Sequence, residues 1–264
     1  MKDSSLEMGL SHIAIMLAAY TIGGVSGAHI NPAITVALAF WKRFAISDVA
    51  AYLGAQLLGA VLAASALHFL FGPALLAKEQ AKGVVRGEPG SVVTAACYGE
   101  YFPNPGGLAA APGAFSAAEY DQLRAQFPLE VAFAAEVLGT AILALVVFAV
   151  TDGKNAGGPA DRWAPVFIGL TVAALISVIA PLTQACFNPA RDLGPRLVAY
   201  FAGWQSVAIP GPNGSGWWSV YLIAPMVGAL LGAGLYERVP RPFVPLRSRR
   251  AVGSWRRSGP SGRR

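Results

Sequence analysis

Apolar residues along this chain gather into five stretches that are each long enough to cross a lipid bilayer as a helix. A spanning helix needs about 20 mostly apolar residues. The stretches run approximately from Gly9 to Val25, Asp48 to Gly72, Leu129 to Val150, Trp163 to Thr183 and Trp217 to Tyr236. Within the last of them, the spacing of Gly228 and Gly232 lets two helix backbones approach closely. The pattern therefore predicts five full membrane-spanning helices.

Two further apolar stretches are too short to span, approximately from Pro32 to Trp41 and from Pro189 to Phe201. Both begin with the same tripeptide, Asn-Pro-Ala, at Asn31 and at Asn188. Each follows a run of small residues that would enter the membrane as extended chain, and a half-length helix behind a non-helical segment is a re-entrant element. Irregular backbone at membrane depth is tolerated only where it is buried in protein or lines a cavity. We therefore expect both elements to line a conduit.

The two short elements are part of an internal repeat. The repeated unit consists of a span, a loop, the Asn-Pro-Ala tripeptide, a half-helix and a second span. A long central loop, approximately residues 73–128, separates its two copies. Three full spans separate the two half-helices, so the second copy is inverted relative to the first. Because successive spans cross the membrane in alternate directions, the central loop lies on one side of the membrane. The basic residues lie on the other side: Lys42, Arg43, Lys154, Arg162 and the C-terminal arginines. Positive charge marks that second side as cytoplasmic.

Composition supports a membrane protein, since 55% of the residues are hydrophobic, 13% are charged and the mean hydropathy is +0.50. The net charge of +6 is concentrated at the C-terminus, where nine arginines lie from Arg238 to Arg264. This segment lacks an apolar period, so we expect residues 237–264 to form a basic, disordered, cytoplasmic tail. Nucleic-acid binding is the alternative for such a tail and is disfavoured.

Chemistry outside the repeat is sparse. The two cysteines, Cys97 and Cys186, have neither metal-ligand spacing nor a disulfide pattern. No nucleophile–base or metal-binding constellation accompanies them. We therefore expect neither an enzyme nor a cofactor or metal site.

The repeated tripeptide suggests how a conduit could select its solutes. Asn is a favoured helix N-cap, and Pro suits the first helical position. Each helix N-terminus carries roughly +0.5 of an elementary charge, so two that meet at the bilayer midplane repel cations, including hydronium. If the side-chain oxygens of Asn31 and Asn188 cap their helices, the NH2 groups remain as donors toward the pore. The pattern predicts passage of water or alcohols with exclusion of protons and cations.

Charged residues follow the second tripeptide. Arg191 lies three residues after Asn188 and so on the same helix face. A cation in the first helical turn opposes the helix dipole and is costly in a membrane, which favours a functional role as a hydrogen-bond donor at the outer mouth. Asp192 and Arg196 have the spacing of a helical ion pair. A local pair that fixes the half-helix and a direct solute contact both remain open for these two residues.

The segments from Ser26 to Ala33 and from Phe187 to Arg196 resemble the major intrinsic protein family, the aquaporins and glycerol facilitators. The resemblance covers approximately residues 9–236. It implies an all-α membrane protein with the aquaporin-like inverted repeat, a channel domain at residues 1–236 and a homotetramer with one pore per subunit. The stretch from Tyr101 to Pro105, like the acid after the second tripeptide, is similar to the glycerol-conducting branch.

The resemblance also assigns roles to particular residues. The implied pore and selectivity positions are Asn31, Asn188, Arg191, Ile176, Ala185, Phe187 and His12, supported by His29, Glu136 and Asp192. Ile176 and Ala185 beside Arg191 imply a wide, apolar opening that suits an alcohol, while the remaining constriction position falls at Ser11 or His12. Glu136 is expected to hold backbone N–H groups of a re-entrant loop, and His29 to pack the other loop.

One feature departs from the family, which has six full spans where this sequence predicts five. The missing helix is the first, and either a start site placed too late or a true truncation would explain it. We expect a passive cell-membrane channel for water and small neutral solutes such as glycerol, with urea also compatible, that excludes protons and ions. The alternatives are a truncated, non-conducting family member and a coupled secondary transporter.

Overall fold

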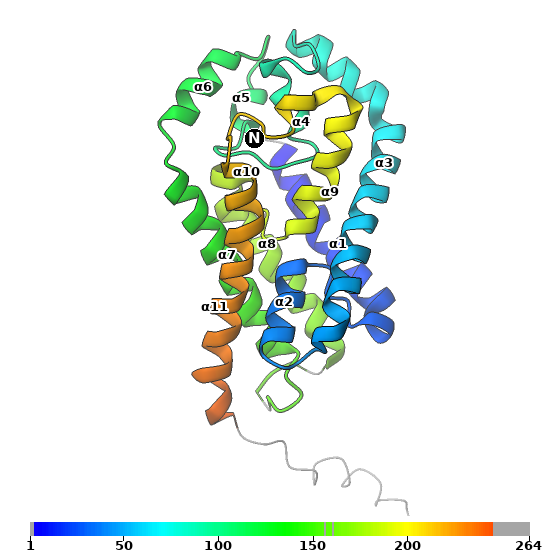
Figure 1. Cartoon of the computed structure of the whole chain (residues 1–264), viewed down its shortest axis with the longest axis vertical. Coiled ribbons are helices and arrows are strands. Elements are labelled where there is room, and N and C mark those ends of the chain that lie inside the picture. Colours follow the sequence, from blue (N-terminus) through cyan, green and yellow to red (C-terminus); the bar gives the residue numbers. More distant parts are fainter. Residues whose placement is uncertain (1–2, 156, 160, 245–264) are drawn as a thin grey trace, which may run out of the picture.

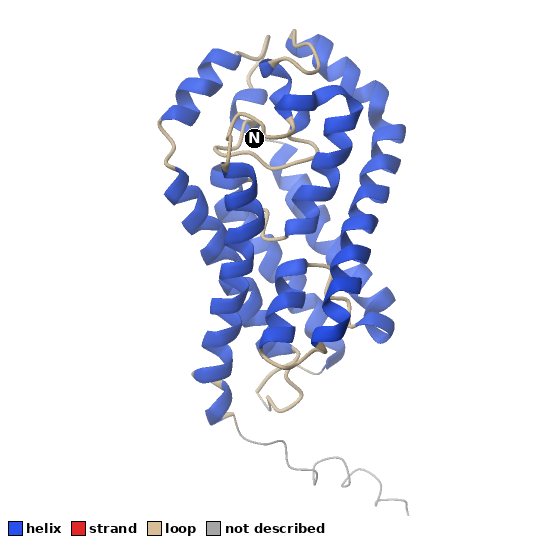
Figure 2. Ribbon diagram, in the orientation of Figure 1, coloured by secondary structure: helices blue, strands red, loops and turns tan. Residues whose placement is uncertain are grey.

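The computed structural model describes residues 3–155, 157–159 and 161–244, with side chains from residue 13 onward apart from residue 161. Every regular element in these ranges is helical (Figure 2). Four helical segments there are long and apolar enough to cross a membrane: Ile46–Lys82, Leu129–Val150, Ala164–Thr183 and Gly216–Phe243. Ile13–Ser26 adds a shorter apolar stretch within the first helix. The expectation of an all-α membrane protein is confirmed.

The first half of the bundle consists of α1 (Asp3–Ser26), α2 (Pro32–Phe40), η1 (Ile46–Asp48) and α3 (Val49–Lys82) (Figure 1). The expected end of the second span near Gly72 is wrong, because α3 continues through Pro73 to Lys82. A proline removes one backbone hydrogen bond, but the strong helix formers after it sustain the helix. The helix ends at Gly83, whose φ of 62° a glycine adopts without strain.

The long central loop is folded and not an open connection. Its short helices are η2 (Pro89–Ser91), α4 (Val92–Ala95), α5 (Gly106–Ala109) and α6 (Ala117–Ala125), which lie over the upper end of the bundle in Figure 1. They share a small core in which Tyr101, Tyr120 and Trp204 are almost fully buried. We call this end of the molecule the loop end.

The second half repeats the first. Its elements are α7 (Leu129–Val150), η3 (Asp161–Trp163), α8 (Ala164–Thr183), α9 (Pro189–Ala199), η4 (Tyr200–Trp204), η5 (Gln205–Val207), α10 (Gly216–Trp218), η6 (Ser219–Ile223), α11 (Ala224–Arg238) and η7 (Arg241–Phe243). The second half-helix ends close to its expected position, where Gly203 has a φ of 108°. Residues 237–244 of the expected tail are ordered, whereas residues 245–264 lie outside the described part. We call the end at which α11 stops the tail end.

The two half-helices occupy opposite halves of the bundle, α2 toward the tail end and α9 toward the loop end (Figure 1). The long helix of each repeat packs against the half-helix of the other, α3 against α9 and α11 against α2. Crossed packing of this kind is what an inverted repeat produces. It brings the N-termini of α2 and α9 to the middle of the bundle.

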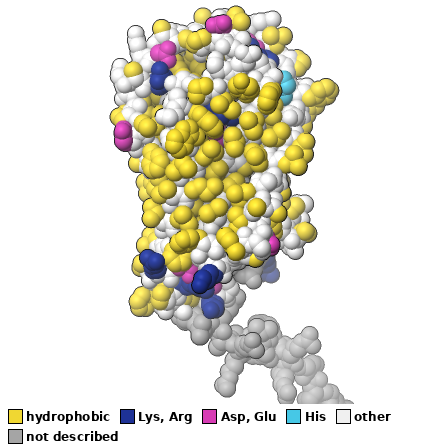
Figure 3. All heavy atoms as spheres, in the orientation of Figure 1, with side chains coloured by type: hydrophobic (Ala, Val, Ile, Leu, Met, Phe, Trp, Pro, Cys, Tyr) yellow, Lys and Arg dark blue, Asp and Glu magenta, His cyan; other side chains and the backbone are white. Residues whose placement is uncertain are grey.

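The outer surface of the bundle is apolar. In Figure 3 hydrophobic side chains cover most of the middle of the visible face, and a group of Lys and Arg lies near its lower end. Leu62 and Phe69 on α3 and Val178 on α8 are 61%, 85% and 74% exposed. Apolar patches of this extent are rare on soluble monomers but fit a lipid environment.

Candidate functional site

The half-helices begin at the two asparagines of the repeated tripeptide. The Asn31 side-chain oxygen accepts the N–H of Ala33 at 2.9 Å. The Asn188 oxygen accepts the N–H groups of Ala190 at 3.1 Å and Arg191 at 3.3 Å. Both are N-cap bonds of the kind that Asn favours, and they leave the NH2 group of each side chain pointing away from its own helix.

The same two side chains join the repeats to each other. Asn31 Nδ2 donates to the carbonyl oxygen of Phe187 at 2.8 Å, and Asn188 Nδ2 donates to that of Ile30 at 2.8 Å. Each amide thus binds the residue that precedes the other asparagine, as a two-fold relation requires. The sequence led us to expect both NH2 groups to be free for solute. Instead, one N–H of each side-chain amide links the two repeats, and the second N–H is left as a further donor.

The loops before the asparagines share one unusual backbone conformation. Positive φ angles occur at Gly27 (72°), Ala28 (48°) and Ile30 (53°) in the first loop and at Gln184 (61°), Ala185 (57°) and Phe187 (54°) in the second. The positions correspond one to one in the repeat. Left-handed backbone is costly for residues with a side chain, so the surrounding structure must hold it in place.

Glu136 on α7 holds the second re-entrant loop. The side chain is fully buried, and one carboxylate oxygen accepts the Thr183 hydroxyl at 2.6 Å and the Cys186 N–H at 2.9 Å. The other oxygen accepts the Phe187 N–H at 2.8 Å. These bonds satisfy N–H groups that no helix could satisfy and fix the strained loop at its centre.

The first re-entrant loop is held by different chemistry. His29 Nδ1 lies 3.2 Å from the Thr35 hydroxyl, which also receives a bond from Gln56 Nε2 at 2.9 Å. The imidazole packs against the rings of Phe44 and Tyr52, with centroids 4.7 Å and 5.1 Å away. His29 is therefore placed as a packing residue of this loop.

Arg191 lies in the first turn of α9, where its backbone N–H donates to the Asn188 side chain. Its side chain is 47% exposed, and it forms an ion pair with Glu100. Glu100 lies between α4 and α5, in residues 96–105, which we call the loop-end segment. Ile176 on α8 is half-buried and Ala185 is 2% exposed. Phe187 is 2% exposed, so it meets the centre of the molecule through its carbonyl group while its ring packs against Gly139.

The remaining expected site residues fall into two groups. Asp192 is fully buried, and Arg196 Nε donates to its carboxylate at 2.9 Å and 3.2 Å. The same carboxylate accepts the Glu100 N–H at 2.7 Å, so Asp192 has the contacts of a local structural pair. The side chains of Ser11 and His12 lie outside the described part of the chain.

Sequence reasoning did not find Glu100 or Gln184. Glu100 is 2% exposed behind Arg191, and Gln184 ties the loop-end segment to the second re-entrant loop by accepting the Tyr101 N–H at 2.9 Å. The signal available for Glu100 was a lone acid placed directly before the stretch from Tyr101 to Pro105. No group of three or more His, Cys, Asp or Glu that could hold a metal occurs among the described residues.

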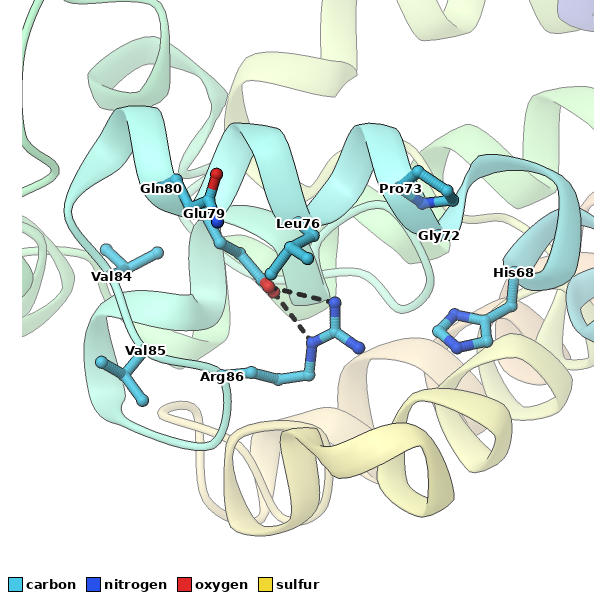
Figure 4. A pocket seen from close by; sticks show the side chains of 9 residues that line it. All are labelled: His68, Gly72, Pro73, Leu76, Glu79, Gln80, Val84, Val85 and Arg86. Carbon is cyan, nitrogen blue, oxygen red and sulfur yellow. Dashed lines mark hydrogen bonds and ion pairs between the residues drawn. The ribbon is translucent and has the colours of Figure 1, made fainter.

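A cavity of about 580 Å³ lies away from these residues, on the loop-end half of α3. Figure 4 shows Arg86 reaching across it to Glu79, with both hydrogen bonds at 3.0 Å. His68, Leu76 and Val85 are among the other residues that line it. None of its lining residues belongs to a re-entrant loop, so this cavity is separate from the centre of the bundle.

Comparison with known proteins decides the family. The model of the major intrinsic protein family matches residues 3–236. The chain belongs to the major intrinsic protein family. It is 38% identical to the glycerol uptake facilitator protein of Pseudomonas aeruginosa over 243 residues, which are 90% of this chain and 79% of that protein. It is 36% identical to the propanediol uptake facilitator of Citrobacter freundii over 243 residues, 90% of this chain and 82% of that one.

A solved structure supports the fold of this major intrinsic protein. The aquaglyceroporin from Plasmodium falciparum superposes with a TM-score of 0.72 at 22% sequence identity, over 92% of this chain and 85% of that chain. A likeness at this identity carries the fold alone. Family membership makes the protein a membrane-spanning channel and not an enzyme.

Proposed function

We propose that this protein is a passive channel for glycerol and other small uncharged solutes, and that it passes water while it excludes protons and ions. The observation that carries the proposal is the reciprocal bonding of Asn31 and Asn188, each to the carbonyl group before the other. It places two helix N-termini and two amide donors at one point in the bundle. The relatives named as facilitators of glycerol and propanediol uptake support the choice of solute.

Electrostatics at this point favours neutral solutes. Two helix N-termini together present roughly one elementary charge in low dielectric, which repels cations. The free N–H of each asparagine orients the oxygen of a passing water or alcohol, so that a water held by two donors does not relay a proton. Arg191 supplies further donors, and Ile176 and Ala185 leave an apolar opening for the carbon side of an alcohol.

Flux into proteoliposomes tests the proposal. The full chain is reconstituted, and glycerol entry is followed by stopped-flow light scattering after a hyperosmotic step. We expect re-swelling several-fold faster than in empty liposomes, without any ion gradient. Re-swelling equal to that of empty liposomes would support a non-conducting member instead, and dependence on an imposed ion gradient would support a coupled transporter.

The distribution of basic residues on the surface supports a location and an orientation in the membrane. We propose a cell-membrane protein that assembles as a homotetramer, with its tail end in the cytoplasm. Basic residues gather at that end, including Lys42, Lys154, Arg162 and Arg238, as the positive-inside rule requires. Cross-linking of the protein in native membranes checks the tetramer, and protease access to an epitope after residue 244 checks the orientation.

A further inference from the structure

The segment between α4 and α5 places the Glu100 carboxylate against the buried side of Arg191. Glu100 is 2% exposed, whereas the Arg191 side chain that pairs with it is 47% exposed. The two side chains are joined as an ion pair between Arg191 Nη1 and Glu100 Oε1. The guanidinium therefore borders the open space, and the carboxylate is covered by it.

The position of Glu100 is fixed through its backbone. Its N–H donates to Asp192 Oδ1 at 2.7 Å, and its carbonyl oxygen accepts from Arg196 Nη2. Next to it, the Tyr101 N–H donates to Gln184 Oε1 at 2.9 Å. The loop-end segment is thus bound to α9 and to the second re-entrant loop, and the Glu100 side chain is free to serve another purpose.

The groups that contact the Glu100 carboxylate indicate what this side chain does. The second carboxylate oxygen, Oε2, is buried and has no hydrogen-bond partner among the described residues. Within the part of the chain that the structure describes, Arg191 is the side chain that pairs with Glu100. A buried carboxylate is costly without an opposite charge, so this glutamate is stabilised by Arg191 and by little else.

Charge balance at the loop end of the bundle depends on this pair. Asp192 and Arg196 are 0% and 1% exposed and neutralise each other. Glu100 and Arg191 form the second pair, so the four charges cancel. Without the Glu100 charge, Arg191 would leave one positive charge beside the N-terminus of α9, which carries a partial positive charge of its own. Such a centre attracts anions strongly in a low dielectric.

We propose that Glu100 determines selectivity as a positioning residue: it neutralises and holds Arg191, so that the constriction donates hydrogen bonds to neutral solutes without drawing anions into the pore. The inference rests on the proposed channel function. It assigns to the loop-end segment an indirect part in selectivity, through the ion pair with Arg191 and not through contact with solute.

Glu100→Gln tests the proposal because it removes the charge and keeps the size. Proteoliposomes carrying the full chain are assayed for glycerol flux by light scattering and for nitrate flux with an anion-sensitive fluorophore. We expect nitrate flux several-fold above the wild-type protein in Glu100→Gln, with glycerol flux retained. Glu100→Asp should restore the wild-type behaviour. Glu119→Gln is the control, because Glu119 is an exposed acid on α6, at the same end of the molecule.

A double variant separates charge from damage to the pore. Glu100→Gln combined with Arg191→Gln leaves no uncompensated charge, so nitrate flux should return to the wild-type level. A leak caused by misfolding would persist in the double variant and would overturn the proposal. So would wild-type nitrate flux in a Glu100→Gln protein that still passes glycerol.

The reciprocal variant covers the case in which Glu100→Gln does not fold. Arg191→Gln alone leaves Glu100 uncompensated and should raise potassium flux over the wild-type level. Unchanged potassium flux in this variant would contradict the charge-balance account. Failure of the channel function itself is distinguishable, because the wild-type protein would then pass no glycerol in the same vesicles.

Discussion

The buried carboxylates of Glu136 and Asp192 have different structural roles because they interact with different groups. Glu136 accepts three hydrogen bonds from neutral groups, the Thr183 hydroxyl and the N–H groups of Cys186 and Phe187. Asp192 is matched by the charge of Arg196. Glu136 therefore acts on backbone conformation, whereas Asp192 acts on charge balance and on the attachment of the loop-end segment.

Glu136→Gln should destabilise the protein and reduce glycerol flux. Glutamine has one acceptor oxygen, and its NH2 group would face a backbone N–H that needs an acceptor. Leaving one buried N–H unsatisfied costs about 1–3 kcal/mol. Thermal unfolding in detergent and flux per reconstituted protein measure both effects. Glu130→Gln on the exposed first turn of the same helix is the control, and equal behaviour of the two variants would refute the role of Glu136.

Arg196→Gln should be more damaging than any change to a surface ion pair. Arg196 Nη1 also donates to the Ala208 carbonyl at 2.8 Å, so its loss frees a buried carboxylate at Asp192 and a buried carbonyl. Breaking a buried pair costs about 3–5 kcal/mol. Arg124→Gln, which removes an exposed pair with Asp121, should cost about 0–1 kcal/mol. Unfolding midpoints compare the two, and similar losses would count against this assignment.

At the scale of elements, the sequence predicted those helix boundaries that depend on interactions between neighbouring residues. The starts of α2 and α9 at Pro32 and Pro189 follow from capping by the asparagines before them, which needs no tertiary information. The extension of α3 beyond Pro73 and the folded loop end were not predicted. The extension of α3 was missed because Pro73 was taken as a helix end although strong helix formers follow it, whereas the folded loop end depends on contacts between distant segments. Glu100 was missed for the same reason, since its backbone partners lie 92 and 96 residues away.

The internal repeat offers a matched test of helix packing. The sequence around Gly59 on α3 aligns without gaps with that around Gly228 on α11. A side chain at Gly228 would meet the backbone of Val137 on α7, whereas one at Gly59 would meet nothing within 4 Å in the described structure. Close backbone approach of this kind requires a small residue.

We therefore expect Gly228→Leu to abolish folded protein and Gly59→Leu to leave yield and glycerol flux near the wild-type values. Overpacking a tight contact costs about 1–3 kcal/mol or more, and at Gly228 the obstacle is backbone that cannot turn aside. Yield of monodisperse protein in detergent and flux per protein measure the difference. Loss of protein in Gly59→Leu would contradict the assignment of Gly59 to an open face of α3.

At the scale of the whole molecule, a charge cluster closes the tail end. Arg43, after α2, donates to Glu237 at 2.5 Å and to Asp152 at 3.2 Å. Arg241 donates to the same two acids, at 2.5 Å and 3.0 Å. The cluster ties together the ends of α2, α7 and α11, which come from both repeats. It therefore fixes the first half-helix from its far end, as Asn188 fixes it from its start.

This cluster should make stability depend on pH through Asp152. Burial alone would raise the pKa of Asp152, but the Lys154 N–H, Arg43 and Arg241 more than offset burial and hold the pKa below the ordinary value of 3.8. Because the pKa is lower in the folded than in the unfolded chain, the stabilisation is fully present above about pH 4 and is lost as the pH falls through the folded-state value.

Asp152→Asn removes the titrating group, so its unfolding midpoint should already be lower at about pH 7 and should fall less than that of the wild-type protein toward about pH 3. Asp48→Asn is the control, because Asp48 is an exposed acid whose side chain accepts only the neighbouring Ser47 hydroxyl among the described groups. Parallel pH profiles for the wild-type protein and Asp152→Asn would mean that ionised Asp152 does not contribute to the pH dependence of stability. A convergence of the two profiles at low pH would show that the ionised Asp152 carboxylate, and with it this ion-pair network far from the asparagines, stabilises the folded protein.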